Sequence, residues 1–230
     1  MMTAWVSKNR WASYHKIFER NPYYWKVDTE GRQLPYIDRV THDTLQDRES
    51  ALLSFIGGGV LMQSRHVTHQ DLPLLQQAAK DGRIDVYLWT HSGKRGLTIM
   101  CNQTYTGADE FARDLLREKK FRWALSHAIP REEISELFCY GLGTPRQLAP
   151  VEQSPYYEYG RRYAEAALEY DLEKANRLID ELGYTERNAA GYRLRPDGKP
   201  IALTVDHSAT TEAAQLAEYF ALRCLKPLGI

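Results

Sequence analysis

The sequence lacks the features that mark several common classes of protein. It has three cysteines, Cys101, Cys139 and Cys224, whose odd number and wide spacing exclude a disulfide framework and a zinc pattern. We expect them to be small buried residues. Thirty basic and thirty acidic residues give a net charge of zero, so the sequence has no excess of positive charge that would favour binding to nucleic acid or an anionic membrane. No run approaches the roughly 18 apolar residues that a membrane span requires.

Motifs of catalysis and cofactor binding are also missing. There is no Gly-x-Ser-x-Gly nucleophile elbow. The glycines 57–59 end a predicted helix and are followed by no Lys-Ser/Thr pair, whereas a phosphate-binding loop begins a helix. His66 and His69 stand three apart at a helix entry, and no carboxylate or cysteine completes a metal site. The sequence therefore predicts neither an enzyme nor a cofactor or metal.

The composition, 43% hydrophobic and 26% charged, is typical of a globular chain, and its elements alternate as in an α/β protein. A strand is expected near Val40 to Leu45, followed by a helix that Asp47 caps. Thr68 and Asp71 form a capping-box-like start for a helix that ends at Asp81. Apolar periodicity and turn signals predict strands at 84–89 and 97–101, helices at 121–128, 130–138, 171–182 and 211–224, a loop at 144–159 and a hairpin at 192–205. We expect Asp171 and Thr211 to cap the last two of these helices.

The most informative tract is Glu19 to Lys26, ERNPYYWK, followed by Leu34 to Val40, LPYIDRV. Proline fixes φ and pushes the residue before it out of the α region, so Asn21-Pro22 closes a strand. Three aromatic residues then anchor the exit of that strand. The tract is interpreted as a rigid crossing between structural units.

Two further tracts occur in a fixed order after it: FRWALSHAIPREEI at 121–134, and YDLEKA at 170–175 with LI at 178–179 and ELG at 181–183. Together with the first tract, they resemble the extracytoplasmic solute-binding proteins of ABC importers, in the oligopeptide, dipeptide and nickel class (solute-binding family 5). The order and spacing of all three tracts agree with that family. The resemblance extends from about residue 11 to the end of the chain.

The resemblance implies a periplasmic-binding-protein-like α/β architecture of two lobes, each only partly present. Residues 1–97 would belong to the first lobe and residues 98–230 to the second. It implies a protein that captures a solute in an interlobe cleft and delivers it to a membrane permease. The solute would usually be a peptide, and sometimes a sugar or a metal complex. The implied location is the periplasm or another extracytoplasmic space.

By resemblance, the strand that ends at Asn102 enters the second lobe, and Met100 and Asn102 are expected to line the cleft. An asparagine after a strand also commonly satisfies backbone groups in a turn. In the long loop predicted at 144–159, Tyr156 and Tyr157 could stack on a ligand or pack against the lobe surface. These four residues are the predicted ligand-binding positions, and both alternatives stay open.

Members of the family are longer than 230 residues, so we expect an internal piece whose second lobe is truncated at the C-terminus. Met1 to Trp5 shows no basic stretch followed by an apolar core of the kind found in export signals. A strand is expected after Ile230. Without it, the strand at 201–205 would have an unpaired edge, and the helices at 121–138 would be partly uncovered. We expect this chain alone to bind no oligopeptide tightly. The alternatives are an interaction fragment without a solute or a hydrolase on a similar scaffold.

Overall fold

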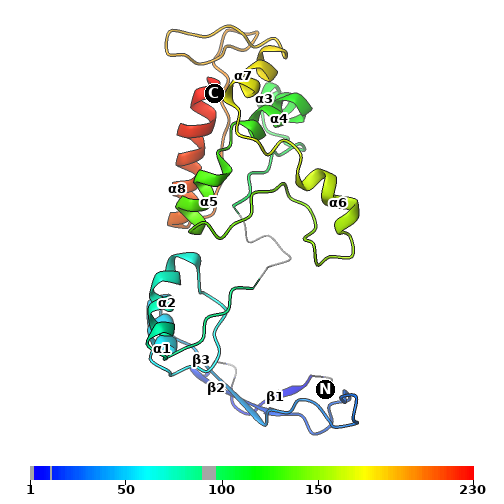
Figure 1. Cartoon of the computed structure of the whole chain (residues 1–230), viewed down its shortest axis with the longest axis vertical. Helices are drawn as coiled ribbons and strands as arrows, with labels where there is room; N and C mark the ends of the chain where they lie inside the picture. Colours follow the sequence, from blue (N-terminus) through cyan, green and yellow to red (C-terminus); the bar gives the residue numbers. More distant parts are fainter. Residues whose placement is uncertain (1–2, 11, 90–96) are drawn as a thin grey trace. The chain divides into compact units, whose positions relative to one another are not determined.

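The computed structural model describes residues 3–10, 12–89 and 97–230, and the chain divides into two compact units, Met1–Tyr87 and Leu88–Ile230 (Figure 1). Within the described residues, no helix combines the length and the apolar character that a membrane crossing needs. The lobe boundary predicted near residue 97 remains a prediction.

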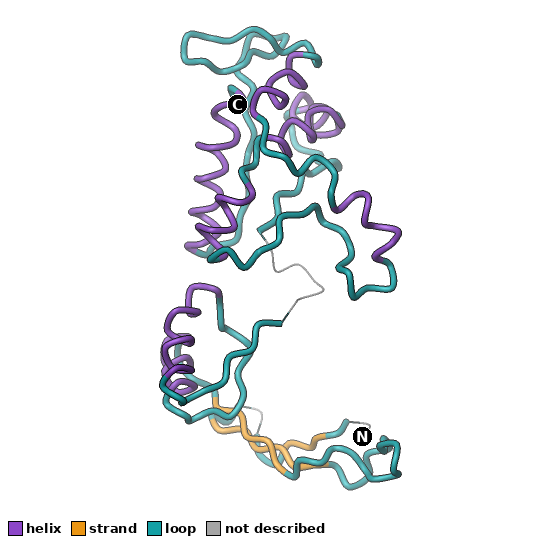
Figure 2. Tube along the Cα trace, viewed as in Figure 1, coloured by secondary structure: helices purple, strands orange, loops and turns teal. Residues whose placement is uncertain are grey.

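Unit 1 begins with a three-stranded antiparallel sheet in the order β1 (Trp5–Ser7), β2 (His15–Arg20) and β3 (Arg39–Asp43), drawn in orange in Figure 2. The register places Phe18 opposite Val40. The strand predicted from Val40 is thus confirmed, and β2 ends just before Asn21-Pro22, as expected. The interpretation of the aromatic tract as a crossing between units is wrong. Residues 21–38 connect two neighbouring strands of one sheet, because the chain turns back antiparallel to β2.

Two helices complete unit 1: α1 (Arg48–Ile56) and, after the short 3-10 turn η1 (His69–Asp71), α2 (Leu72–Lys80). The predicted cap is confirmed, since Asp47 Oδ1 accepts a hydrogen bond from Ser50 N at 2.6 Å. Asp71 Oδ2 accepts from Thr68 N at 2.7 Å, which is the backward half of the predicted capping box. The same oxygen lies 2.5 Å from Arg48 Nη2, so one ion pair joins the first turn of α1 to the start of α2.

The strands predicted at 84–89 and 97–101 are wrong, because neither segment takes part in a sheet within the described residues. Ile84 and Val86 pack against the small core formed by Ile56, Leu75 and Ala78. Alternation therefore identified the buried side of this segment correctly. It could not show whether another strand runs alongside, and a strand exists only through such a neighbour.

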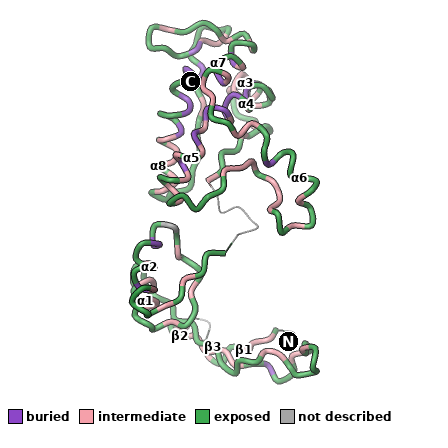
Figure 3. Tube along the Cα trace, viewed as in Figure 1, coloured by how far each residue is buried: buried purple, intermediate pink, exposed green. Residues whose placement is uncertain are grey.

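Unit 2 is mainly helical. Its described helices are α3 (Glu110–Arg117), α4 (Lys119–His127), α5 (Arg131–Cys139), α6 (Tyr157–Ala164), α7 (Leu172–Asp180), α8 (Thr211–Phe220), the π-helical turn η2 (Ala221–Leu225) and α9 (Lys226–Leu228). Its core joins α4, α7 and the C-terminal helices, and buried segments of the chain are drawn in purple in Figure 3. Phe121, Ile179 and Leu228 are among the buried residues. Helix α5 lies beside α8 (Figure 1). The ring of Phe138 on α5 meets that of Tyr219 on α8 edge to face, with ring centroids 5.9 Å apart.

Three expectations for unit 2 need correction. The loop predicted to reach residue 159 ends at Tyr156, because α6 begins at Tyr157. Thr210, and not Thr211, caps α8, accepting a hydrogen bond from Ala213 N at 3.3 Å. The turn of the predicted hairpin forms and Leu194 bridges to Pro200, but residues 201–205 make no ladder with any described strand.

A buried arginine ties the end of α7 to the C-terminal segment. Arg193 is 1% exposed, and its Nη1 lies 2.5 Å from Asp180 Oδ1. Its Nε donates to Leu228 O at 2.7 Å, its Nη2 donates to Asn176 Oδ1 at 2.9 Å, and Nη1 also donates to Tyr184 O. One side chain therefore satisfies acceptors from three segments of unit 2, which compensates for burying its charge.

Candidate functional site

The predicted positions Met100 and Asn102 lie in an extended segment near the start of the described part of unit 2. The side chain of Met100 is 64% exposed. Asn102 Oδ1 accepts hydrogen bonds from Thr104 N and Thr104 Oγ1, both at 3.1 Å. The asparagine oxygen is thus used in a turn, while no described residue accepts a hydrogen bond from its amide nitrogen. A turn role and a ligand role can coexist here.

Tyr156 and Tyr157 lie at the start of α6. Tyr156 is exposed, whereas Tyr157 is half-buried and its hydroxyl is 3.5 Å from Glu152 Oε1. Among the described residues, no hydrogen bond or ring contact joins either tyrosine to Met100 or Asn102. The ligand role of all four residues stays a prediction.

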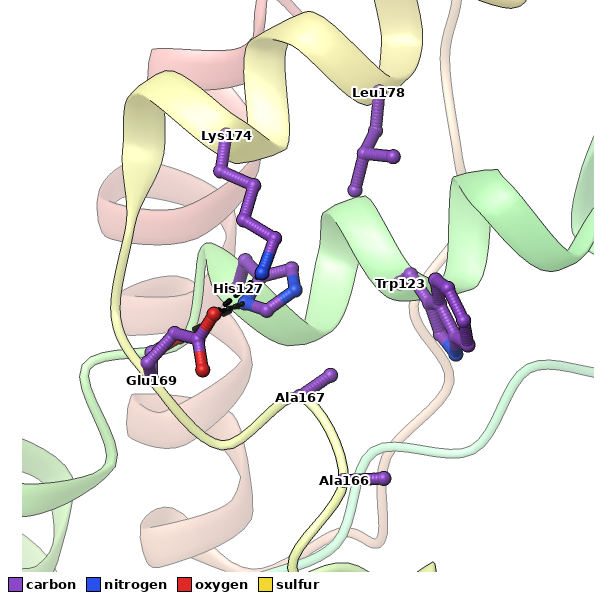
Figure 4. Close-up of a pocket in the computed structure, with 7 residues that line it drawn as sticks. All are labelled: Trp123, His127, Ala166, Ala167, Glu169, Lys174 and Leu178. Atoms are coloured by element: carbon purple, nitrogen blue, oxygen red, sulfur yellow. Dashed lines mark hydrogen bonds and ion pairs between the residues drawn. The ribbon is translucent and has the colours of Figure 1, made fainter.

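A pocket of about 310 Å³ lies elsewhere in unit 2, between α4, α7 and the chain that connects α6 to α7 (Figure 4). Helix α4 contributes Trp123 and His127, which are one turn apart on the same side of the helix. The other lining residues are Ala166, Ala167 and Glu169 from the connecting chain, and Lys174 and Leu178 from α7. The pocket is mainly apolar, with charged groups at one end.

His127 is 2% exposed, and its Nδ1 lies 3.1 Å from Glu169 O and 3.8 Å from Glu169 Oε1. Lys174 Nζ is 2.5 Å from the same Glu169 oxygen. This hydrogen bond and the lysine charge hold the pKa of the Glu169 carboxyl below its ordinary value. The carboxylate is therefore ionised at neutral pH, while the hydrogen bond to the backbone oxygen of Glu169 orients the imidazole.

The chain that connects α6 to α7 is held in place by a small network of hydrogen bonds. The Ser126 hydroxyl donates to Ala167 O at 2.8 Å, and Arg131 Nη1 donates to Leu168 O at 3.1 Å. Gln147 Nε2 donates to Ser126 Oγ at 2.8 Å. Burial lowers the pKa of the Arg131 guanidinium. These contacts set the position of the backbone that walls the pocket.

A second hollow lies in unit 1 and is lined by four charged residues that are already paired. Arg20 Nε lies 3.0 Å from Asp38 Oδ1, and Arg39 Nη2 lies 3.2 Å from Glu19 Oε1. Paired surface charges offer little to a ligand. The described residues contain no group of three side chains able to hold a metal ion.

In the sequence, the helix at 121–128 stands out only for its buried face and as part of a family tract. Trp123 and His127 are not predicted from it as a pair. The available signal was their spacing of four residues, which places an aromatic ring and an imidazole side by side on a helix. That Glu169 and Lys174 would meet them depends on packing across more than forty residues of chain.

Comparisons with known proteins agree with the resemblance seen in the sequence. Residues 6–230 match the sequence profile of the bacterial extracellular solute-binding proteins, family 5 Middle. A probable ABC transporter-binding protein of Deinococcus radiodurans is 23% identical over 86% of this chain and 33% of its own length. A periplasmic alpha-galactoside-binding protein of Rhizobium meliloti is 27% identical over 86% of this chain and 29% of its own length.

Solved structures show the same relationship. An oligopeptide-binding protein OppA is 34% identical with a TM-score of 0.68, covering 100% of this chain and 36% of the other. A periplasmic oligopeptide-binding protein of Thermotoga maritima shares the fold at 20% identity with a TM-score of 0.69, covering 41% of its own chain. The expected periplasmic-binding-protein-like architecture is thus confirmed.

The chain spans about a third of the length of the curated relatives it matches. Because the family profile covers nearly all of its residues, the chain belongs to the bacterial extracellular solute-binding proteins of family 5.

Proposed function

We propose that the chain is part of the substrate-binding component of an ABC importer, acting outside the cytoplasm by binding and not by catalysis. The observation that carries the proposal is the family match over residues 6–230. It is supported by the relatives, which are named as an ABC transporter-binding protein, an alpha-galactoside-binding protein and oligopeptide-binding proteins. The partner would be the permease of that importer, and the solute an oligopeptide or a related compound.

We further propose that Met100, Asn102, Tyr156 and Tyr157 contribute to the solute cleft of the whole protein. The amide nitrogen of Asn102, which donates to no described residue, suits a peptide carbonyl or a sugar hydroxyl, since both accept hydrogen bonds. Exposed Met100 and Tyr156 supply adaptable apolar and aromatic surface, which suits the binding of peptides that carry different side chains. No part of this proposal needs a cofactor.

The test is to purify the whole protein of which this chain is proposed to be part from its own cells, through a tag added to its gene, and to identify released small molecules by mass spectrometry after unfolding. We expect peptides or oligosaccharides in stoichiometric amount, and less of them with Asn102→Ala. The matched control is Asn188→Ala, which removes another turn asparagine, a half-buried one whose Oδ1 likewise accepts from backbone amides two and four residues ahead. A protein that releases neither class of solute, and whose melting temperature no peptide or oligosaccharide raises, would refute the proposal.

A further inference from the structure

We propose that the pocket between α4 and α7 binds a small, uncharged aromatic molecule that carries a hydrogen-bond donor, such as a phenol or an indole. The group that recognises the donor is Nε2 of His127. This site shares no residue with the positions proposed for solute binding, so it would be a second, separate binding site in unit 2.

The hydrogen bond at Nδ1 of the His127 imidazole determines whether Nε2 carries a hydrogen in the neutral ring. Nδ1 of His127 lies 3.1 Å from a backbone carbonyl, Glu169 O, and a carbonyl oxygen can only accept. Nδ1 must therefore carry the proton. In the neutral ring, Nε2 is then an acceptor with a lone pair and no hydrogen. The nearby carboxylate of Glu169 strengthens this arrangement, because it favours the proton on Nδ1.

That lone pair has no partner within the described residues. Among the described residues, three side-chain atoms are both fully buried and without a hydrogen bond: Arg146 Nε, Arg195 Nε and Tyr219 Oη. His127 Nε2 also has no hydrogen bond but is not one of these three, so it is not fully buried. It therefore reaches the surface of the pocket that His127 lines. Figure 4 shows the ring nitrogen that is not joined to Glu169 directed toward the side of the pocket where Trp123 lies. A nearly buried acceptor without a partner calls for a donor from outside.

The walls define the rest of the ligand. Trp123 and Leu178 face the space from two helices, and Ala166 and Ala167 close it with methyl groups (Figure 4). An aromatic ring suits such walls because it can stack on or meet the indole edge to face. The volume of about 310 Å³ is at the lower end for small-molecule sites, so one small molecule fits.

The charges at the pocket explain why the ligand should be neutral. Glu169 and Lys174 are paired at 2.5 Å, so neither offers an uncompensated charge. An ionic ligand would lose its hydration in a mainly apolar pocket without gaining a counter-ion. A metal ion is excluded as the occupant on the donor set, since His127 and Glu169 are the only metal-ligating side chains that line the pocket.

The experiment compares phenol with toluene, which has nearly the same shape but no donor, by NMR titration of the 230-residue chain. We expect phenol to bind about fivefold or more tightly than toluene, the difference typical of one hydrogen bond. His127→Phe keeps a ring of similar size and removes the acceptor. It should abolish the preference for phenol while toluene still binds.

Ala166→Leu is the second variant and fills the pocket from an exposed position on its rim. It should weaken both probes at least tenfold. Ala209→Leu is the matched control, because Ala209 is exposed and does not line the pocket. The proposal is overturned if the wild-type protein binds phenol and toluene equally. It is also overturned if Ala166→Leu binds phenol and toluene as tightly as Ala209→Leu does. If His127→Phe does not fold, the comparison of these two alanine variants tests the proposal.

Discussion

Replacing Arg193 by methionine should destabilise unit 2 more than any single surface substitution. Arg193 is 1% exposed and donates to Leu228 O, Tyr184 O and Asn176 Oδ1, besides its ion pair with Asp180. Methionine fills a similar volume but donates no hydrogen bond, so three hydrogen bonds to neutral acceptors are lost. Asn176 Oδ1 and Leu228 O keep a second donor, Arg187 Nη2, whereas Tyr184 O keeps none among the described residues.

The size of the effect follows from these contacts. Each hydrogen bond lost to a neutral acceptor costs about 1 kcal/mol, which gives about 3 kcal/mol in the free energy of unfolding for the three bonds. The side chain of Asp180 is 46% exposed, so water can replace the guanidinium and its loss adds little. The total lies at the lower end of the roughly 3–5 kcal/mol that breaking a buried ion pair costs.

Urea denaturation followed by far-ultraviolet circular dichroism measures this effect, because most of the helices lie in unit 2. The matched control is Arg161→Met, which removes a 59% exposed arginine whose Nε lies 3.8 Å from Glu165 Oε1. The control should change the free energy by about 0.5 kcal/mol or less. Arg193→Lys should fall between the two, since one ammonium cannot reach acceptors on three segments.

Hydrogen exchange locates the effect. In Arg193→Met, the amides of residues 226–230 should lose protection first, because Leu228 loses its bond to the arginine. If Arg193→Met is within about 1 kcal/mol of Arg161→Met, the reasoning from buried acceptors is refuted.

Three further outcomes are expected. Thr210→Ala removes the cap of α8 and should cost about 1 kcal/mol, with faster exchange of the first turn; unchanged exchange would contradict the cap. Hydrogen bonds from Tyr36 and Arg32 lower the pKa of Asp28 to about 2, below its ordinary value of 3.8, so its stabilising contribution is present above that ordinary value and is lost as the pH falls toward about 2. Asp28→Asn should flatten this part of an acid titration of stability, and an identical acid response in the variant would count against it. Burial raises the pKa of the Cys224 thiol to about 12, so Cys224 should resist a thiol reagent at pH about 8 until the protein unfolds; rapid labelling of the native chain would disprove this.

Exposed apolar side chains lie on α4 and α5, and the segment after Ile201 has no partner strand among the described residues. Ile201 is buried, but the segment that follows it forms no ladder with the described strands. Leu137 on α5 is 60% exposed, although apolar periodicity assigns it to the buried stripe of that helix, and Trp123 on α4, which the periodicity does not assign to the core, is 44% exposed. The periodicity was right for Phe121, Ala124 and Ile134, which are buried.

The sequence by itself determined the local features of this protein and its family. Asp47 and Asp171 cap their helices as expected, through hydrogen bonds to amides three residues ahead. Such bonds depend only on neighbours in the chain, so residue type and spacing suffice to predict them. The family followed in the same way, because three tracts in a fixed order can be recognised without coordinates.

Only the tertiary structure decided which segments have partners. Residues 84–89 and 97–101 have the composition of strands, yet no described strand lies beside them, and pairing depends on residues far away in the chain. The pocket at His127 has the same origin. Its imidazole meets Glu169 forty-two residues further along, and this contact leaves Nε2 as an acceptor facing an apolar space. Local preference acts over one turn of chain, whereas pairing and pockets depend on packing between distant segments.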